Sequence, residues 1–471
     1  MSSPSSVPLE DTAGRFSGRA WGTLLVLCGA LFLDALDVSM KGVALPSIGA
    51  ELGMSTSSLQ WVVSAYVLGF GGFLLLGGRA ADLLGRRRVF LVALAAFLVA
   101  SGLGGLAHGG QALIAARFAT GVSAAFTAPA GLSIITTSFS EGPIRNRALS
   151  IYAATGASGF SLGLVVGGLL TDINWRLVFV VPVLMAAATL LGALRLVHDQ
   201  QPPARTGGFD LPGAISATAG LTLLVFALVE APERGWASAQ TLGAFAGAAL
   251  LLAVFTVVEY RTTQPLLRLS LLRSGPLVRA NLGAMSLLGG WIGTLFILTL
   301  YMQQLRGWSA LQTGLAVSPC GVVVALLAPR IAAPLVSRFG VAPIIITGLS
   351  ASVLAYLLIL RLRVDSNYAV DMLPTFLLVG IAFALAYGPL NMAATNGVPA
   401  HEQGVAGGIV NTSFQIGPAL ALAAVTAVNN QTVRTAGTTQ ALLDGFRAAL
   451  LVPLAIAVLG VLITAPGLRN K

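Results

Sequence analysis

The sequence predicts an all-α integral membrane protein with many spans. Of its 471 residues, 56% are hydrophobic and only 9% are charged, and the mean hydropathy is +0.86. A soluble domain carries about 25% charged residues, so this chain lacks the polar surface needed to cover a compact shape in water. Glycine is abundant, at 55 residues, and it lets apolar helices approach closely in a bilayer. A soluble enzyme is therefore excluded.

The formal net charge of +10 does not indicate a nucleic-acid partner, because the basic residues form short clusters between apolar runs. The two lysines, Lys41 and Lys471, lie outside any Gly-Lys-Ser/Thr step, which a Walker A loop needs. The three histidines have no metal-site spacing, and both cysteines lie inside apolar segments. We therefore expect no P-loop, zinc or thiol enzyme, no metal site and no nucleic-acid partner.

The chain begins with a polar tail, residues 1–20, followed by an apolar run from Trp21. That run continues past two aspartates without a cleavage site, so we interpret it as a retained span rather than a signal peptide. A span needs about 20 mostly apolar residues. Fourteen are expected, with 211–230 and 240–259 deciding between twelve and fourteen: 21–45, 58–78, 88–107, 112–136, 148–170, 175–197, 211–230, 240–259, 277–302, 311–335, 342–361, 372–396, 404–428 and 446–466.

Charge placement predicts the orientation of these spans. Most of the 27 Lys and Arg residues lie in tails and connections on one side, which indicates a cell membrane protein with both termini in the cytoplasm. The chain also repeats weakly, since residues 53–64 resemble 307–318 and Gly85 matches Gly340. Two halves of the same topological sense are typical of transporters whose binding site lies near the midplane.

The connection between the second and third spans is short, rich in glycine and strongly basic. Glycines permit a tight turn, and an acid beside a basic cluster can attach to a neighbouring helix end and release it. The alternative is a positive-inside loop with an acid present by chance. The candidate inner gate consists of Gly78, Asp82, Gly85, Arg86, Arg87 and Arg88.

The first span carries three charged residues, Asp34, Asp37 and Lys41, whose spacing places them on one helical face. Asp37 lies about 24 Å along the helix axis from Trp21. Charges at such depth are costly and usually functional, and a carboxylate there can alternate between protonated and ionised states. We expect proton binding at Asp37, aided by Asp34. The alternative is a structural Asp–Lys pair that is neutral overall.

The fourth span contains a lone arginine, Arg117, near its outer end. An intramembrane arginine needs a partner, and the carboxylates of the first span are the obvious candidates. We therefore include Arg117 in the proton-binding group. The alternative is an arginine whose side chain extends to the membrane interface.

Two further groups of residues stand out within apolar spans. In the fifth span, glycines at four-residue spacing form a smooth face for close helix contact, which either slides during transport or simply packs. This face consists of Gly159, Gly163, Gly167 and Gly168. In later spans, polar pairs at i, i+4 spacing either line a substrate cavity or form hydrogen bonds between helices. The pairs are Tyr387 with Asn391, and Asn411 with Gln415.

These segments resemble a known family. The loop 78–88 is similar to the signature Gly-x-x-x-Asp-x-x-Gly-Arg-Arg/Lys of the major facilitator superfamily, which gates the inner face. "LDVSMKGVALP" resembles the first-span motif of its 14-span drug:proton antiporters, with Asp37 on the acidic position, and "RFATG" resembles the span-4 Arg-x-x-x-Gly motif. The fifth-span glycines resemble the antiporter motif, with Leu164 at its proline position. Further matches in family order, from "NWRLVF" to "GVAGGIVNTSFQIGPALALA", extend the resemblance from about residue 20 to 466.

The resemblance implies the major facilitator fold, with two six-helix bundles plus two inserted helices. The expected divisions are a cytoplasmic tail (1–20), an N-terminal bundle (21–200), an inserted two-helix segment with linkers (201–275), a C-terminal bundle (276–466) and a cytoplasmic tail (467–471).

The implied function is proton-coupled secondary transport, exporting hydrophobic drugs, antibiotics or related metabolites by alternating access. The implied partners are a small hydrophobic substrate, protons and the lipid bilayer, and we expect a monomer. No cofactor is expected, because the proton gradient is the energy source. Since Leu164 and Lys41 depart from the family pattern, antiport and uniport stay open. The alternatives are a uniporter or uptake carrier of a small metabolite, or a transporter-like receptor that does not translocate.

Overall fold

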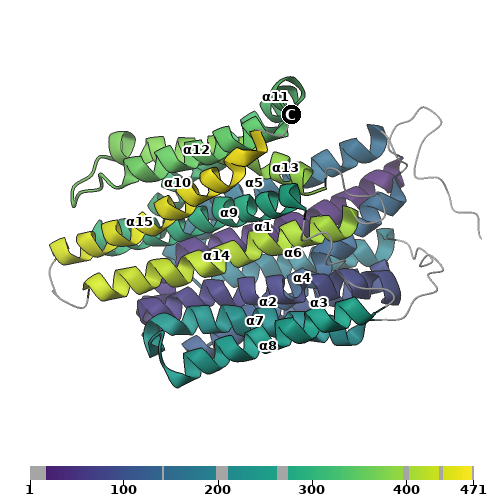
Figure 1. The fold of residues 1–471 in the computed structure, drawn as a ribbon, viewed down its shortest axis with the longest axis horizontal. Helices are drawn as coiled ribbons and strands as arrows, with labels where there is room; N and C mark the ends of the chain where they lie inside the picture. The colour runs from purple at the N-terminus through teal and green to yellow at the C-terminus, as the bar shows by residue number, and fades with distance from the viewer. Residues whose placement is uncertain are drawn as a thin grey trace, which may run out of the picture.

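The computed structural model describes residues 17–139, 143–197, 210–262, 274–395, 403–433 and 439–468, and every regular element in them is a helix. The long helices run along one common direction (Figure 1). They are α1 Gly18–Leu52, α2 Thr56–Leu84, α3 Arg86–Gly105, α4 Gly110–Ser138, α5 Pro143–Ile173, α6 Leu177–Leu196, α7 Leu211–Arg234, α8 Ala239–Arg261, α9 Gly275–Leu300, α10 Ala310–Leu327, α12 Val341–Ile359, α13 Leu373–Thr395, α14 Gln403–Val433 and α15 Thr439–Thr464, with a short α11 at Ala333–Phe339.

Eleven helical stretches in the described residues are long and apolar enough to cross a membrane. The other three expected spans coincide with α2, α5 and α7, which carry shorter apolar stretches, so the number fourteen is not itself confirmed. The expected span 311–335 is helical throughout, because α10 continues from Leu327 through a π-helical turn, Ala328–Ala332, directly into α11. The sequence has proline at 329, and proline cannot donate the backbone hydrogen bond that continues an α-helix.

The two halves share local geometry at matching points, as the weak sequence repeat predicts. Gly53 and Gly307 end their helices with φ of 62° and 66°, and Gly85 and Gly340 separate theirs with φ of 93° and 85°. Residues with a side chain rarely adopt such angles, which is why glycine stands at these breaks. The two halves are therefore built on the same plan.

We refer to α1–α6 as the N-terminal half and to α9–α15 as the C-terminal half; in Figure 1, α12 lies near the upper edge, α2 and α3 lie in the lower part, and α1, α5, α9 and α14 lie between them. Helix α5 packs against both α1 and α10, and α2 packs against both α4 and α14. The two halves thus meet along two seams, α5/α10 and α2/α14. Helices α7 and α8 lie along the lower edge, where α7 contacts both α2 and α14.

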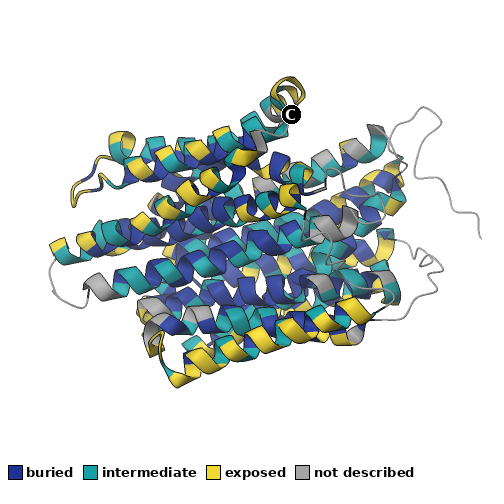
Figure 2. Cartoon of the chain, viewed as in Figure 1, coloured by how far each residue is buried: buried dark blue, intermediate teal, exposed yellow. Residues whose placement is uncertain are grey.

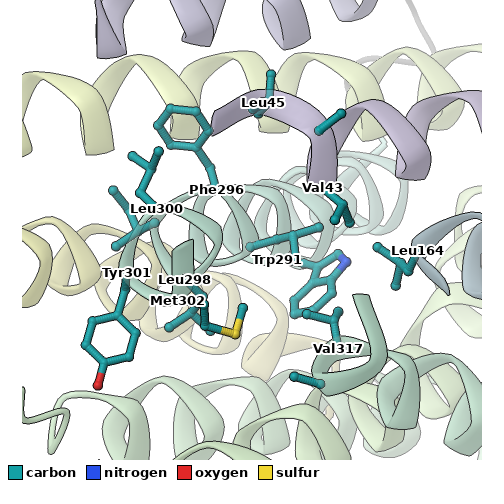
Figure 3. Packing of buried hydrophobic residues seen from close by; sticks show 14 of the residues in the cluster. Val43, Leu45, Leu164, Trp291, Phe296, Leu298, Leu300, Tyr301, Met302 and Val317 are labelled. Carbon is teal, nitrogen blue, oxygen red and sulfur yellow. The ribbon is translucent and has the colours of Figure 1, made fainter. Parts of the chain in front are cut away.

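Buried residues gather in the middle of the bundle, and exposed residues follow the outer helix α8 (Figure 2). The exposed residues of α8 include the apolar Leu242, Leu250 and Val254. This distribution suits a bilayer, where lipid rather than water meets the outer faces. The largest buried cluster joins the two halves. Val43 of α1, Leu164 of α5, Trp291 of α9 and Val317 of α10 lie together within it (Figure 3).

Candidate functional site

Three charged residues predicted from sequence form one buried ionic cluster. Asp37 pairs through Oδ1 with the Lys41 ammonium one turn along α1, and through Oδ2 with Arg117 Nη1 of α4 at 2.6 Å. The three side chains are at most 3% exposed. The expected Asp37–Arg117 pair is present, as is the Asp37–Lys41 pair that the sequence offers as the structural alternative, and the side chain of Arg117 is buried. Asp37 therefore carries one cation on each carboxylate oxygen.

Aromatic rings and one backbone carbonyl complete the surroundings of the two cations. Arg117 donates from Nε to the carbonyl of Val62 at 3.2 Å, and its guanidinium lies 4.6 Å from the ring centre of Tyr66. The Lys41 ammonium lies 4.4 Å from the ring centre of Phe179 on α6. Ring faces attract cations where water is excluded. Helices α1, α2, α4 and α6 thus all contribute to holding these charges.

Asp34 lies in a different environment from Asp37. Its Oδ1 accepts a hydrogen bond from the Tyr66 hydroxyl, and the side chain is only half-buried. Asp34 also lines a cavity of about 20 Å³ together with Thr127 of α4 and Tyr152 of α5. The structure therefore brings both predicted carboxylates to one face of α1, but Arg117 forms its ion pair with Asp37.

The fifth-span glycines lie in two contacts rather than one. Gly159, Gly163 and Gly167 face the backbone of α1, whereas Gly168 faces the first residues of α10 in the other half. A Cβ added at any of the four would lie less than 3.0 Å from a backbone atom. The predicted close contact is present, and only Gly168 lies on the seam between the halves.

The polar pairs of the C-terminal half do not lie together in one group. Tyr387 is 45% exposed and its ring stacks on Phe414, with centroids 4.7 Å apart. Asn391 donates to the Tyr387 carbonyl and Asn411 to the Gly407 carbonyl, each within its own helix. Gln415 instead lines a small cleft between α2, α7 and α14.

The candidate inner gate is described only in part. Gly78 lies within α2 and Gly85 forms the break before α3, while the side chain of Asp82 lies outside the described residues. Arg87 donates to the carbonyls of Val197 and Leu194 at 2.6 and 3.1 Å, at the carboxyl end of α6. Cations are favoured at that end of a helix. Arg86 is half-buried and Arg88 is exposed.

Residues 27–422 match the family model described as Major Facilitator Superfamily. The chain belongs to the Major Facilitator Superfamily. It is similar to the puromycin resistance protein pur8 of Streptomyces alboniger, with 37% identity over 90% of this chain and 85% of that protein. It is also similar to the cephamycin export protein CmcT of Amycolatopsis lactamdurans, with 38% identity over 90% of this chain and 88% of that protein.

Solved structures agree on the major facilitator fold. The peptide transporter PepTSo of the POT family superposes with a TM-score of 0.69 and 14% identity, covering 95% of this chain and 99% of that one. A D-xylose–proton symporter superposes with a TM-score of 0.66 and 16% identity, covering 95% and 97%. At such low identity the likeness concerns the fold alone.

In this superfamily member the two halves are in direct contact. Asp172 at the end of α5 accepts hydrogen bonds from the backbone N–H groups of Ala310 and Leu311, at 2.9 and 3.4 Å. Gln303 donates to the Val43 carbonyl at 2.9 Å. These bonds join the halves at the end predicted to be outer.

Sequence reasoning missed Asp172, Gln303 and Tyr66, which all contact the other half or the charge cluster. A tyrosine or glutamine in an apolar span has no spacing pattern that separates it from packing. The sequence does contain a signal for Asp172, because this acid lies at the end of the glycine-rich span. The helix that faces it, α10, begins after the N-cap residue Ser309. Carboxylates are favoured at helix N-termini.

Proposed function

We propose that this chain is a proton-coupled secondary transporter that exports hydrophobic drugs, antibiotics or related metabolites by alternating access. The observation that carries the proposal is the buried cluster of Asp37, Lys41 and Arg117, with Asp34 beside it. Such charges deep in a bilayer are costly, and they mark proton relays and substrate pathways. Two relatives, a puromycin resistance protein and a cephamycin export protein, support this substrate class by their names.

The contacts between the halves support alternating access. Hydrogen bonds accepted by Asp172 and donated by Gln303 join the halves at the predicted outer end. Tyr387 of α13 is, by contrast, 45% exposed. This state is then one in which substrate enters from the cytoplasmic side. Export requires the outer contacts to break as the halves rock.

The remaining assignments follow from the same proposal. Asp37, Asp34 and Arg117 carry the proton coupling, and the loop 78–88 gates the inner face. Of the span-5 glycines, Gly168 lies at the contact where the halves move, while Gly159, Gly163 and Gly167 hold α5 against α1. Both termini lie in the cytoplasm, the protein acts as a monomer in the cell membrane, and the proton gradient supplies the energy without a cofactor.

Efflux is the direct test. Cells that express the protein and are loaded with ethidium or puromycin should lose the compound faster than cells with an empty vector. Because the proton gradient drives the export, an uncoupler should abolish the difference. Efflux that continues with an uncoupler would instead indicate uniport. Binding of puromycin to the purified protein without any transport would indicate a receptor.

Asp172→Ala should loosen the predicted outer end. The variant loses a charged acceptor at the start of α10, worth about 1 kcal/mol, which corresponds to roughly a fivefold change in a two-state equilibrium. A cysteine placed at Val317, which is fully buried at the seam, reports the opening. In a background with Cys28 and Cys320 replaced by Ala, a membrane-impermeant maleimide should label this cysteine several-fold faster. In Asp172→Asn, which keeps a hydrogen-bond acceptor, the cysteine at position 317 should be labelled at nearly the original rate. Equal labelling rates in the original protein, Asp172→Ala and Asp172→Asn would contradict the role of Asp172 in closing the outer end.

A further inference from the structure

The two carboxylates of α1 differ in their access to water. Asp37 is 0% exposed, and each of its oxygens contacts a cation. Water has no path to either oxygen in this state. Protonating Asp37 would also leave Lys41 and Arg117 buried without an anion between them, which is a strongly unfavourable arrangement. These contacts suit a fixed counter-ion.

Asp34 has the access that Asp37 lacks. It is half-buried, and its Oδ1 accepts a hydrogen bond from the Tyr66 hydroxyl. The adjoining cavity of about 20 Å³ is lined by Asp34, Thr127 and Tyr152. That volume is enough for one water molecule, and polar side chains on its wall can hold it. A carboxylate beside such a space can exchange a proton with water.

The cavity has one wall on α5, the helix that packs against α10 of the other half. Tyr152 on that wall belongs to α5. Asp34 therefore adjoins a space bounded by a helix that takes part in the contact between the halves.

We infer that Asp34, rather than the motif residue Asp37, takes up and releases the transported proton, and that Asp37 is the counter-ion of Lys41 and Arg117. The inference rests on the proton coupling of the proposed function. A hydronium ion from the predicted outer side gives up one O–H bond and becomes water, and its proton forms the O–H bond on Asp34 Oδ2. In the state described here that bond breaks, and the proton passes to a water molecule in the adjoining cavity, which becomes hydronium and leaves toward the cytoplasm.

The groups around Asp34 give this step an electrostatic effect. The titratable and charged residues that face it are Asp37 and Lys41 on α1, Tyr66 on α2, Arg117 on α4 and Tyr152 on α5. The residues of α3 that line the cavity are Leu94 and Phe97, and neither carries a charge. With Asp34 ionised, two carboxylates balance two cations. When Asp34 is protonated, the cluster carries one net positive charge. The two protonation states therefore differ in net charge where the cavity meets α1.

Infrared difference spectroscopy of the purified full-length protein tests the inference without any substrate. The protonated carboxyl band should appear as the pH falls, and Asp34→Asn should remove it. The matched control is Asp37→Asn/Lys41→Met, which keeps Asp34 and restores the charge balance of the cluster. In that double variant the band should remain. Size-exclusion chromatography and thermal unfolding check that each variant is folded.

Two results would overturn the inference. One is a band that survives Asp34→Asn and disappears in Asp37→Asn/Lys41→Met, since it would assign the proton to Asp37. The other is the lack of any titrating buried carboxyl in the unmodified protein. Neither depends on whether the protein exports a drug, so failure of this inference is distinct from failure of the proposed function.

Discussion

Asp37→Asn is expected to destabilise the folded protein as well as to stop export. The substitution leaves Lys41 and Arg117 buried and unpaired with an anion, and removing one partner from a buried ion pair costs about 3–5 kcal/mol. Folded yield in detergent and the thermal unfolding temperature should both fall. Sequence alone suggests a variant that loses proton coupling and keeps its fold. The second cation on Asp37 changes that expectation.

A charge-balanced control separates this effect from loss of the carboxylate alone. Lys41→Met removes one cation and leaves Asp37 paired with Arg117, so it should cost much less than Asp37→Asn. Asp37→Asn/Lys41→Met should recover most of the lost stability, which a double-mutant cycle measures as a coupling between the two sites. Equal stability of Asp37→Asn and the unmodified protein would show that the cluster does not hold these cations in place.

Gly167→Val and Gly168→Val, at neighbouring positions, should fail in different ways. A Cβ at Gly167 would lie 2.6 Å from Met40 Cα of α1, inside one half. Since that contact exists throughout the cycle, we expect little folded protein. A Cβ at Gly168 would lie 2.6 Å from the Ala310 carbonyl oxygen and from Leu311 Cα, across the seam. Opening the outer end relieves that clash, so this variant should fold.

The Gly168→Val protein should spend most of its time open at the predicted outer end. Overpacking costs about 1–3 kcal/mol, which shifts an equilibrium by roughly 5–150-fold. Export should therefore slow by about tenfold or more, while the cysteine at Val317 becomes readily labelled. Gly243→Val is the control, because nothing lies within 4 Å of a Cβ there. Normal export by Gly168→Val would mean that this contact does not close during transport.

Much of the fold was accessible from sequence because its determinants are local. Apolar length fixes where most helices run, and glycines with positive φ mark the same breaks in both halves. The π-helical turn between α10 and α11 was not accessible, since tertiary packing decides how a helix accommodates a proline. Helix α4 begins at Gly110, which places Arg117 two turns inside it and explains why its side chain reaches the core.

The sequence predicts which residues form the candidate site, but not which of them bond to one another. Spacing on α1 predicts that Asp34, Asp37 and Lys41 share a face, and electrostatics predicts a carboxylate partner for Arg117. Which carboxylate it meets depends on how α4 and α1 are rotated against each other, and sequence spacing carries no such information. The hydroxyl that bonds Asp34 comes from α2, a helix on which sequence reasoning placed no part of the proton site.

The inserted hairpin α7–α8 is attached unequally to the two halves. Trp61 of α2 donates a hydrogen bond to Glu230 of α7 at 3.0 Å, and its ring contacts that of Phe226. Toward α14, the buried contacts of α7 are apolar, with Val225 in one cluster with Ala419 and Ala423. Apolar contacts can exchange by sliding, whereas a directional hydrogen bond cannot. We therefore expect the hairpin to move with the N-terminal half, so that the two bodies present unequal surfaces to the lipid.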